Sequence, residues 1–177
     1  MSDLDFYTRV AARGDVLGVG VGAAPGAWEA AVGADYLDDP GRGRLRRDYG
    51  LVEVLFSADL AEGALSCDGI SVQAHRLIHG ACAPPALVRA YGEFRPRVRF
   101  AELRSAIVAL GHEVEPEDLP KDVHRYRVSG SGARIFVVED PDPYGDGPHG
   151  VCDPSVHRTG DVWALSVSPG WWGRVGR

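Results

Sequence analysis

Hydrophobic residues near the N-terminus follow the spacing of an amphipathic helix. Phe6 and Val10 stand four residues apart, as they would on one helical face. Ser2 can cap the first turn with Asp5 at the capping-box position, and Gly14 is suited to end the helix. The pattern therefore predicts a helix that begins after Ser2 and ends by Gly14.

Two more helices follow from the same kind of pattern. Pro25 and Gly33 flank a short helix predicted over 28–32, which contains Trp28. We expect Trp28 in the core, and likewise Trp163, which lies within a strand predicted near the C-terminus. In the second half, an apolar helical face that ends at Gly111 consists of Phe100, Leu103, Ile107 and Leu110. We expect these four side chains to be buried against a sheet.

Strand patterns occupy the rest of the first half. A basic turn over 42–47 leads into a β-branched and aromatic run over 49–56. Residues 70–77 then alternate apolar and polar side chains, as in a strand with one face in water. This alternation predicts that Ser71, Gln73 and His75 share the wet face.

The second half shows a similar order of elements. An acidic loop over 113–118 is followed by strands predicted over 126–128, 134–138 and 161–168, and we expect the last two in one sheet; a long Pro/Gly/Asp-rich loop over 139–160 separates them. When the helix end at Gly33 is aligned with the helix end at Gly111, the strand orders of the two halves agree. We therefore predict an α+β protein of two similar lobes, residues 1–90 and 91–177. Each lobe is expected to be a short helical pair packed on an antiparallel sheet.

Composition limits the classes of protein to consider. The 177 residues carry a formal net charge of −6, which argues against a nucleic-acid-binding surface. Arginine almost replaces lysine and asparagine is absent, a usage typical of a G+C-rich and, we expect, bacterial genome. No apolar run is long enough for a membrane helix, and the N-terminus lacks the features of a signal peptide, so we expect a cytoplasmic protein. The odd number of cysteines, Cys67, Cys82 and Cys152, favours free, buried or half-buried thiols.

Three segments of the chain resemble a known family. They are Trp28-Glu-Ala-Ala-Val-Gly33, Asp48-Tyr49-Gly50 with the strand after it, and Gly69-Ile-Ser-Val-Gln73. Together they resemble the helix-loop-helix and strand signature of the β-lactamase inhibitor protein fold. They are also similar to small bacterial proteins encoded beside polymorphic toxins. The resemblance implies a tandem fold and a role as an immunity protein that binds and inhibits a toxin.

Candidate sites for catalysis and metal binding are weak in this sequence. The Gly18-Val-Gly-Val-Gly22 run lacks the spacing of a phosphate-binding loop and is better explained as a turn between helices. His149, Cys152 and His157 could supply zinc ligands, but their spacing matches no established finger. The sequence therefore predicts no metal and no cofactor. An alternative is a small enzyme that uses His75 with Cys67 and Asp48.

We expect the protein to act by binding rather than by catalysis. The predicted partner is a protein, such as a toxin domain with a basic surface, and neither nucleic acid nor membrane is expected to bind. The acidic loop with one aromatic residue is the first candidate surface, the wet sheet faces are the second, and one of two adjacent tryptophans is a candidate contact. The predicted partner-binding residues are Asp140, Asp142, Tyr144, Asp146, Glu53, Gln73, His75 and Trp172. A second alternative is a structural or regulatory partner of a larger assembly.

Overall fold

The computed structural model describes residues 1–58, 63–117, 124–140 and 156–169. Helix α1 (Asp3–Arg13) begins at the predicted capping box, in which Ser2 and Asp5 bond each other's backbone N–H groups, and ends at Gly14 in the left-handed conformation. Helix α2 (Pro25–Val32) ends at Gly33 and buries Trp28 completely. Both helix predictions are confirmed.

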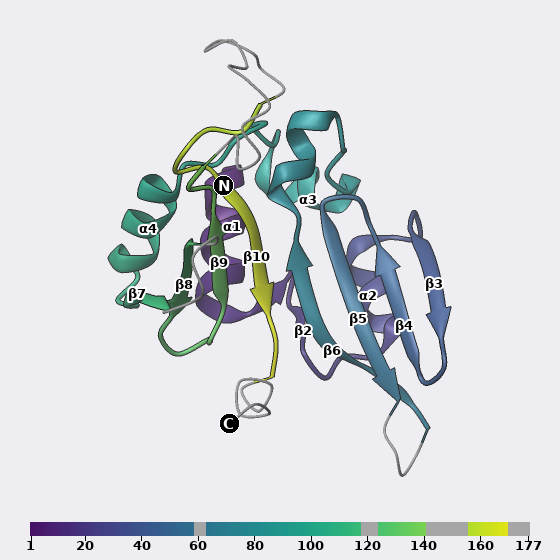
Figure 1. Cartoon of the computed structure of the whole chain (residues 1–177). Coiled ribbons are helices and arrows are strands. Elements are labelled where there is room, and N and C mark those ends of the chain that lie inside the picture. Colours follow the sequence, from purple (N-terminus) through teal and green to yellow (C-terminus); the bar gives the residue numbers. More distant parts are fainter. Residues whose placement is uncertain (59–62, 118–123, 141–155, 170–177) are drawn as a thin grey trace.

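Within the described residues, eight antiparallel strands form one sheet, in the order β3-β4-β5-β6-β10-β9-β8-β7. The first four strands in the chain are β3 (Leu37–Gly41), β4 (Arg44–Asp48), β5 (Val52–Ala58) and β6 (Leu65–Val72). The last four are β7 (Val114–Glu117), β8 (His124–Val128), β9 (Arg134–Val137) and β10 (Val162–Val167). Strands β6 and β10 pair at the centre, with Ser71 opposite Ser166, so the two halves of the chain share a continuous sheet (Figure 1).

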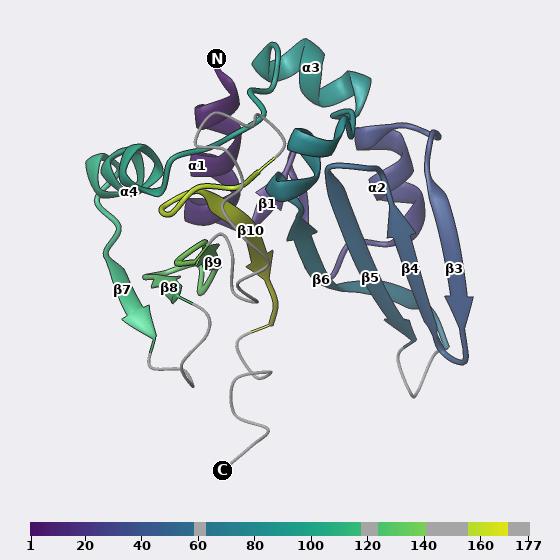
Figure 2. The same cartoon turned by 45° about the horizontal axis from the view of Figure 1, so that its top comes forward.

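Helices cover one face of this sheet. Helices α1 and α2 lie behind the strands in Figure 1, and the turned view of Figure 2 shows the remaining helices α3 (Pro85–Tyr91) and α4 (Phe100–Ala109) beside them. Helix α1 contacts α3, α4 and β10, and α2 contacts α3 and β6. The N-terminal helix therefore packs on the last strand of the sheet, and a single hydrophobic core extends across both halves.

The overall α+β class with antiparallel pairing agrees with the prediction, and β9 and β10 lie in one sheet as expected, where they pair with each other. The description of the chain as two similar lobes divided near residue 90 stays a prediction.

Several local predictions were wrong. The turn predicted over 42–47 is limited to residues 42 and 43, since β4 begins at Arg44, and the acidic segment 113–118 contains β7. The strand predicted over 70–77 ends at Val72, and the 3₁₀ helix η1 (Ala74–His79) follows it. His75 therefore does not share a strand face with Ser71 and Gln73. The glycine-rich run after α1 forms a small hairpin of β1 (Asp15–Val16) and β2 (Val19–Gly20).

Side-chain burial also differs at some predicted positions. Leu103 and Ile107 are fully buried and Phe100 is half-buried, but Leu110 is 61% exposed because α4 ends at Ala109. Trp163, predicted in the core, is 43% exposed, since a register shift between Val162 and Ala164 redirects its side chain. Cys67 is buried as expected, whereas Cys82 is exposed.

The two edge strands share one feature. Pro40 lies in β3 and Pro116 lies in β7, and in the sheet formed by the described residues each of these strands pairs with one neighbour. Proline has no N–H group, so it weakens an edge as a template for another strand. No helix in the described part of the chain has the length and apolar character needed to cross a membrane.

Candidate functional site

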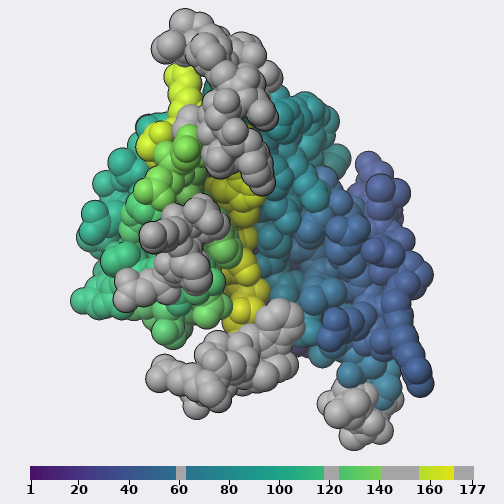
Figure 3. Space-filling view, viewed as in Figure 1, coloured from purple at the N-terminus to yellow at the C-terminus, as the bar shows by residue number. Residues whose placement is uncertain are grey.

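The face of the sheet away from α1 and α2, here called the open face, carries a hollow of about 670 Å³. Alternation along β5 places Val52, Val54 and Phe56 in the core and turns Glu53 and Leu55 to the open face. The hollow is lined by residues of seven strands, β4 to β10, and of the segment after β10: Arg46, Glu53, Val54, Leu55, Gly69, Ile70, Ser71, Glu117, Arg125, Arg134, Phe136, Ser166, Val167 and Ser168. Figure 3 shows this face, with β10 in yellow between the strands of the two halves.

Small side chains form the floor of the hollow. Gly69 and Ser71 of β6 lie beside Ser166 of β10 and Ser168, which follows β10. The flanking strands carry long side chains at the same level. A row of small residues between two rows of large ones leaves space for side chains of a binding partner.

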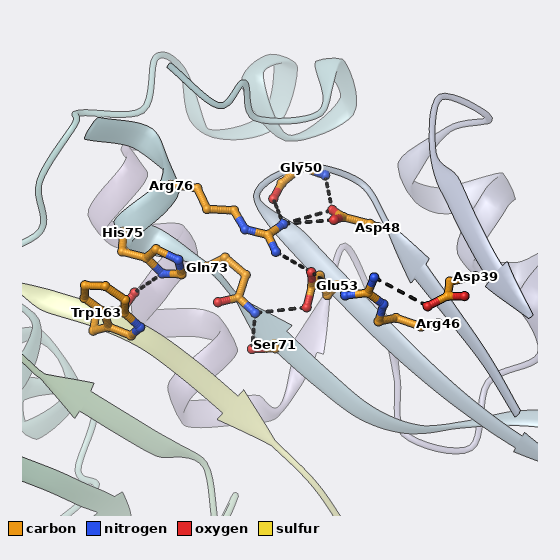
Figure 4. Close-up of polar contacts among 10 residues, drawn as sticks. All are labelled: Asp39, Arg46, Asp48, Gly50, Glu53, Ser71, Gln73, His75, Arg76 and Trp163. Carbon is orange, nitrogen blue, oxygen red and sulfur yellow. Dashed lines mark hydrogen bonds and ion pairs between the residues drawn. The ribbon is translucent and has the colours of Figure 1, made fainter. Parts of the chain in front are cut away.

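Glu53 is the centre of a polar cluster on the first-half side of the hollow (Figure 4). Its Oε2 accepts a hydrogen bond of 3.0 Å from Gln73 Nε2, which also bonds Ser71 Oγ at 3.1 Å. Its Oε1 accepts from Arg76 and lies 3.5 Å from a terminal nitrogen of Arg46. Only 14% of the Glu53 side chain is exposed, so these contacts fix a nearly buried carboxylate.

Arg76 links this cluster to the turn between β4 and β5. It binds both carboxylate oxygens of Asp48 at 3.0 and 3.1 Å, and donates to the carbonyl of Gly50 at 3.0 Å. Burial by itself would lower the pKa of Arg76, but its bonds to Glu53 and Asp48 raise that pKa above its ordinary value. The guanidinium therefore stays charged and holds the turn against η1.

A second ion-pair cluster lies on the opposite side of the hollow. Glu117 Oε2 is 2.5 Å from Arg125 Nε and 3.1 Å from Arg134 Nε. Arg134 also donates to Ser168 Oγ at 3.3 Å. Each side of the hollow thus has a glutamate that is bound by two arginines.

An aromatic cluster lies beyond Gln73, at the end of the central strands. The rings of His75 and Trp163 are stacked with centroids 4.2 Å apart, and His75 Nδ1 is 3.2 Å from the carbonyl oxygen of Trp163. The ring of His157 lies 4.8 Å from that of Trp163 and 6.0 Å from that of His79. Burial lowers the pKa of both His75 and His157.

The structure brings together some of the residues predicted from the sequence. Glu53 and Gln73 are hydrogen-bonded partners on the open face, and His75 lies nearby on η1 against Trp163. Asp140 is exposed after the end of β9. The remaining predicted contacts lie outside the described residues: Asp142, Tyr144, Asp146 and Trp172.

Sequence reasoning missed the arginines of the open face. The run Arg44-Leu-Arg-Arg-Asp48 alternates around Leu45, with Arg44, Arg46 and Asp48 on the open face and Arg47 buried beneath Tyr36. A period of two in this basic run was the signal for a strand. A turn assigns these arginines to no common face, whereas a strand places Arg44 and Arg46 on the open face, where Arg46 lines the hollow.

The alternative catalytic set is not assembled in the structure. Cys67 belongs to the hydrophobic core, where burial raises its thiol pKa to about 12. Asp48 is on the open face and is occupied by Arg76. His75 packs on Trp163. A thiol held neutral and away from both other groups is poorly placed to act as a nucleophile with them.

Metal binding gains no support from the described residues, in which no group of three or more His, Cys, Asp or Glu side chains could hold an ion. Of the three candidate zinc ligands, His149 and Cys152 lie outside the described residues. Comparisons of the chain with protein-family models, curated proteins and solved structures find no match.

Proposed function

We propose that this chain binds a protein partner on its open sheet face and neutralises it by covering the partner's active surface, as an immunity protein does with a toxin. The observation that carries the proposal is the hollow of about 670 Å³, floored by small side chains at the junction of β6 and β10. A projecting segment of a partner can enter this hollow while the surrounding strands contact its flanks.

The polar groups around the hollow favour binding of a folded partner. Arg46, Arg76 and Gln73 are held by Glu53, and Arg125 and Arg134 are held by Glu117. Because these long side chains are already ordered, less rotamer freedom is lost when a partner binds. Charged groups fixed in this way also select partners of complementary charge.

Trp163 adds a candidate anchor at the end of the open face. Its indole is partly exposed and is fixed by stacking on His75. Tryptophan is enriched among residues that dominate protein interfaces. The hollow and this indole together suit a protein surface better than a small ligand enclosed on all sides.

The test uses the protein encoded by the gene adjacent to that of this chain. Ser166→Trp fills the floor of the hollow, and Val108→Trp, at a 53% exposed position on α4, is the matched control. Titration calorimetry should show that the parent and Val108→Trp bind alike, while Ser166→Trp binds about tenfold more weakly or worse. Far-UV circular dichroism verifies that both variants are folded.

Neutralisation is tested in cells that express the adjacent gene product. We expect this product to arrest growth, the parent chain to restore growth, and Ser166→Trp to fail. Absence of binding, binding unchanged by Ser166→Trp, or absence of growth arrest would each contradict the proposal.

A further inference from the structure

Three arginines form a cluster on β8 and β9 at one side of the hollow. Arg125 and Arg127 stand two residues apart on β8 and therefore face the same side of the sheet. Arg134 of β9 is directly opposite Arg127 in the antiparallel register. Like charges in directly opposed positions destabilise a sheet, so this arrangement needs a compensating anion.

The carboxylates of the chain compensate this cluster only in part. Glu117 engages Arg125 and Arg134 through one oxygen atom, and Glu115 stands opposite Arg127 in β7. Within the described part of the chain, Arg127 makes no ion pair, and Arg125 makes none other than that with Glu117. Arg125 and Arg134 therefore line the hollow together with Ser166 and Ser168, and the exposed Arg127 lies next to Arg134 on the same face.

We propose that the cluster of Arg125, Arg127 and Arg134 binds carboxylate groups on an acidic segment of the protein partner. This inference rests on the proposed function, since it names the chemistry of the segment that enters the hollow. A guanidinium presents paired N–H donors that match the two oxygens of a carboxylate. The local excess of arginine is notable in a chain whose net charge is −6.

Nucleic acid is a less suitable occupant. A phosphate backbone needs a basic field along its path, but Glu53 and Glu117 line the same hollow. Separate carboxylates on a peptide can meet the arginines and leave the glutamates in their ion pairs.

The experiment selects binders from a random-peptide phage library on the folded parent protein. Clones that bind the parent and not Ser166→Trp are kept, and their sequences are compared with the unselected library. Synthetic peptides from these clones are titrated against Arg127→Gln, the double variant Arg125→Gln/Arg134→Gln and the control Arg104→Gln. Arg104 is an exposed arginine on α4, so its replacement makes the same charge change away from the hollow.

The proposal predicts that selected peptides are enriched in Asp and Glu. Their affinity should fall about tenfold or more in the double variant, fall less in Arg127→Gln, and stay unchanged in Arg104→Gln. Arg127→Gln keeps the test informative if the double variant does not fold, because Arg127 makes no ion pair in the described part of the chain.

Other outcomes separate this inference from the proposed function. Peptides that need the hollow but are rich in Lys and Arg, or show no charge preference, would overturn the inference and leave the binding function intact. Failure to obtain any peptide that depends on the hollow would count against both. Tight binding of a single-stranded oligonucleotide that is lost in the arginine variants would overturn the inference in favour of a phosphate ligand.

Discussion

A single carboxylate, that of Glu53, holds three side chains on the open face. Its two oxygens bind Arg46, Arg76 and Gln73, and Arg76 in turn binds Asp48. Removal of the charge leaves two guanidinium groups beside a neutral amide. Because both arginines retain partial contact with water, the resulting decrease in the free energy of unfolding should be moderate.

Glu53→Gln should lower the free energy of unfolding by about 1–2 kcal/mol, since charged hydrogen bonds at a nearly buried position are lost. The matched control is Glu102→Gln, which removes a half-exposed ion pair with Arg95 and should cost less than about 0.5 kcal/mol. Urea denaturation followed by circular dichroism measures both. Equal losses in the two variants would show that Glu53 does not organise the cluster.

Two apolar residues at the C-terminal end of α4, Ile107 and Leu110, offer a second contrast. Ile107 is fully buried, and Leu110 lies just past the helix in solvent. Ile107→Ala should destabilise the protein by about 2–5 kcal/mol, the usual range for a large-to-small change in a core. Leu110→Ala should change stability by less than about 0.5 kcal/mol. Similar values for both variants in urea titrations would contradict the assigned helix face.

The half-buried histidines beside Trp163, His75 and His157, should make stability depend on pH. Both ring nitrogens of His157 are buried and have no hydrogen-bond partner among the described residues, and the ring is close to Asp161, His75, His79 and Arg97. Burial, the largest cause, lowers the pKa of His157, and Asp161 acts in the opposite direction. Burial likewise lowers the pKa of His75, which Arg76 and His79 lower further, while its bond to Trp163 and the charge of Glu53 raise it.

A lowered pKa means that the folded protein binds fewer protons than the unfolded chain below pH 6.5, the usual histidine pKa. The contribution of His75 and His157 to stability should thus be complete above that pH and should decrease as the pH falls through their folded-state pKa values. The double variant His75→Gln/His157→Gln should flatten this decrease, whereas His124→Gln, which replaces an exposed histidine of β8, should keep it. Urea midpoints between pH 5 and 8 measure the effect, and an unchanged slope in the double variant would count against it.

At the scale of elements, the turn between β4 and β5 depends on one glycine. Gly50 has a φ of 85°, donates its N–H to Asp48 Oδ1 at 2.7 Å, and would place an added Cβ 2.9 Å from the carbonyl oxygen of Cys82. Other residues are strained in this conformation. Gly50 therefore connects β4 to β5 and also lies against η1, through Arg76, and against the segment that contains Cys82.

Gly50→Ala should destabilise the protein by more than about 1 kcal/mol, since alanine is strained at this positive φ and its Cβ would lie too close to the carbonyl oxygen of Cys82. Gly26→Ala is the control with the opposite sign. Gly26 lies in α2 with nothing near its added Cβ, so alanine should stabilise by about 0.5–1 kcal/mol. Thermal unfolding of both variants tests the contrast, and a stabilised Gly50→Ala would contradict the turn geometry.

Elements with strong local signals were predictable from the sequence, and those defined by distant pairing were not. Ser2, Gly14 and Gly33 mark helix ends through local bonds, so α1 and α2 were recognised. Strand β3 consists of Leu-Asp-Asp-Pro-Gly and has no strand signal of its own, but it pairs with β4 along its whole length. Tertiary contacts decide such segments. The end of β6 was misplaced because the alternation of 70–77 continues into η1.

At the scale of the whole molecule, the open face follows from pairing across the sequence. Glu53 and Gln73 could be proposed as surface residues from strand alternation alone. Their position beside a hollow could not, because the hollow needs β6 paired with β10, whose registered residues are more than 90 positions apart. The same long-range pairing places Glu117, Arg125 and Arg134 at the hollow.

Under the proposed function, the prolines in β3 and β7 limit the ways in which this protein can bind a partner. Since a proline in each edge strand disfavours addition of a further strand, the proposed recognition would rely on side chains more than on backbone pairing. Side-chain recognition can be altered one residue at a time. Substitutions among the open-face residues could therefore redirect the protein to a new partner while the scaffold stays unchanged, which makes this sheet suited to rapid divergence of specificity.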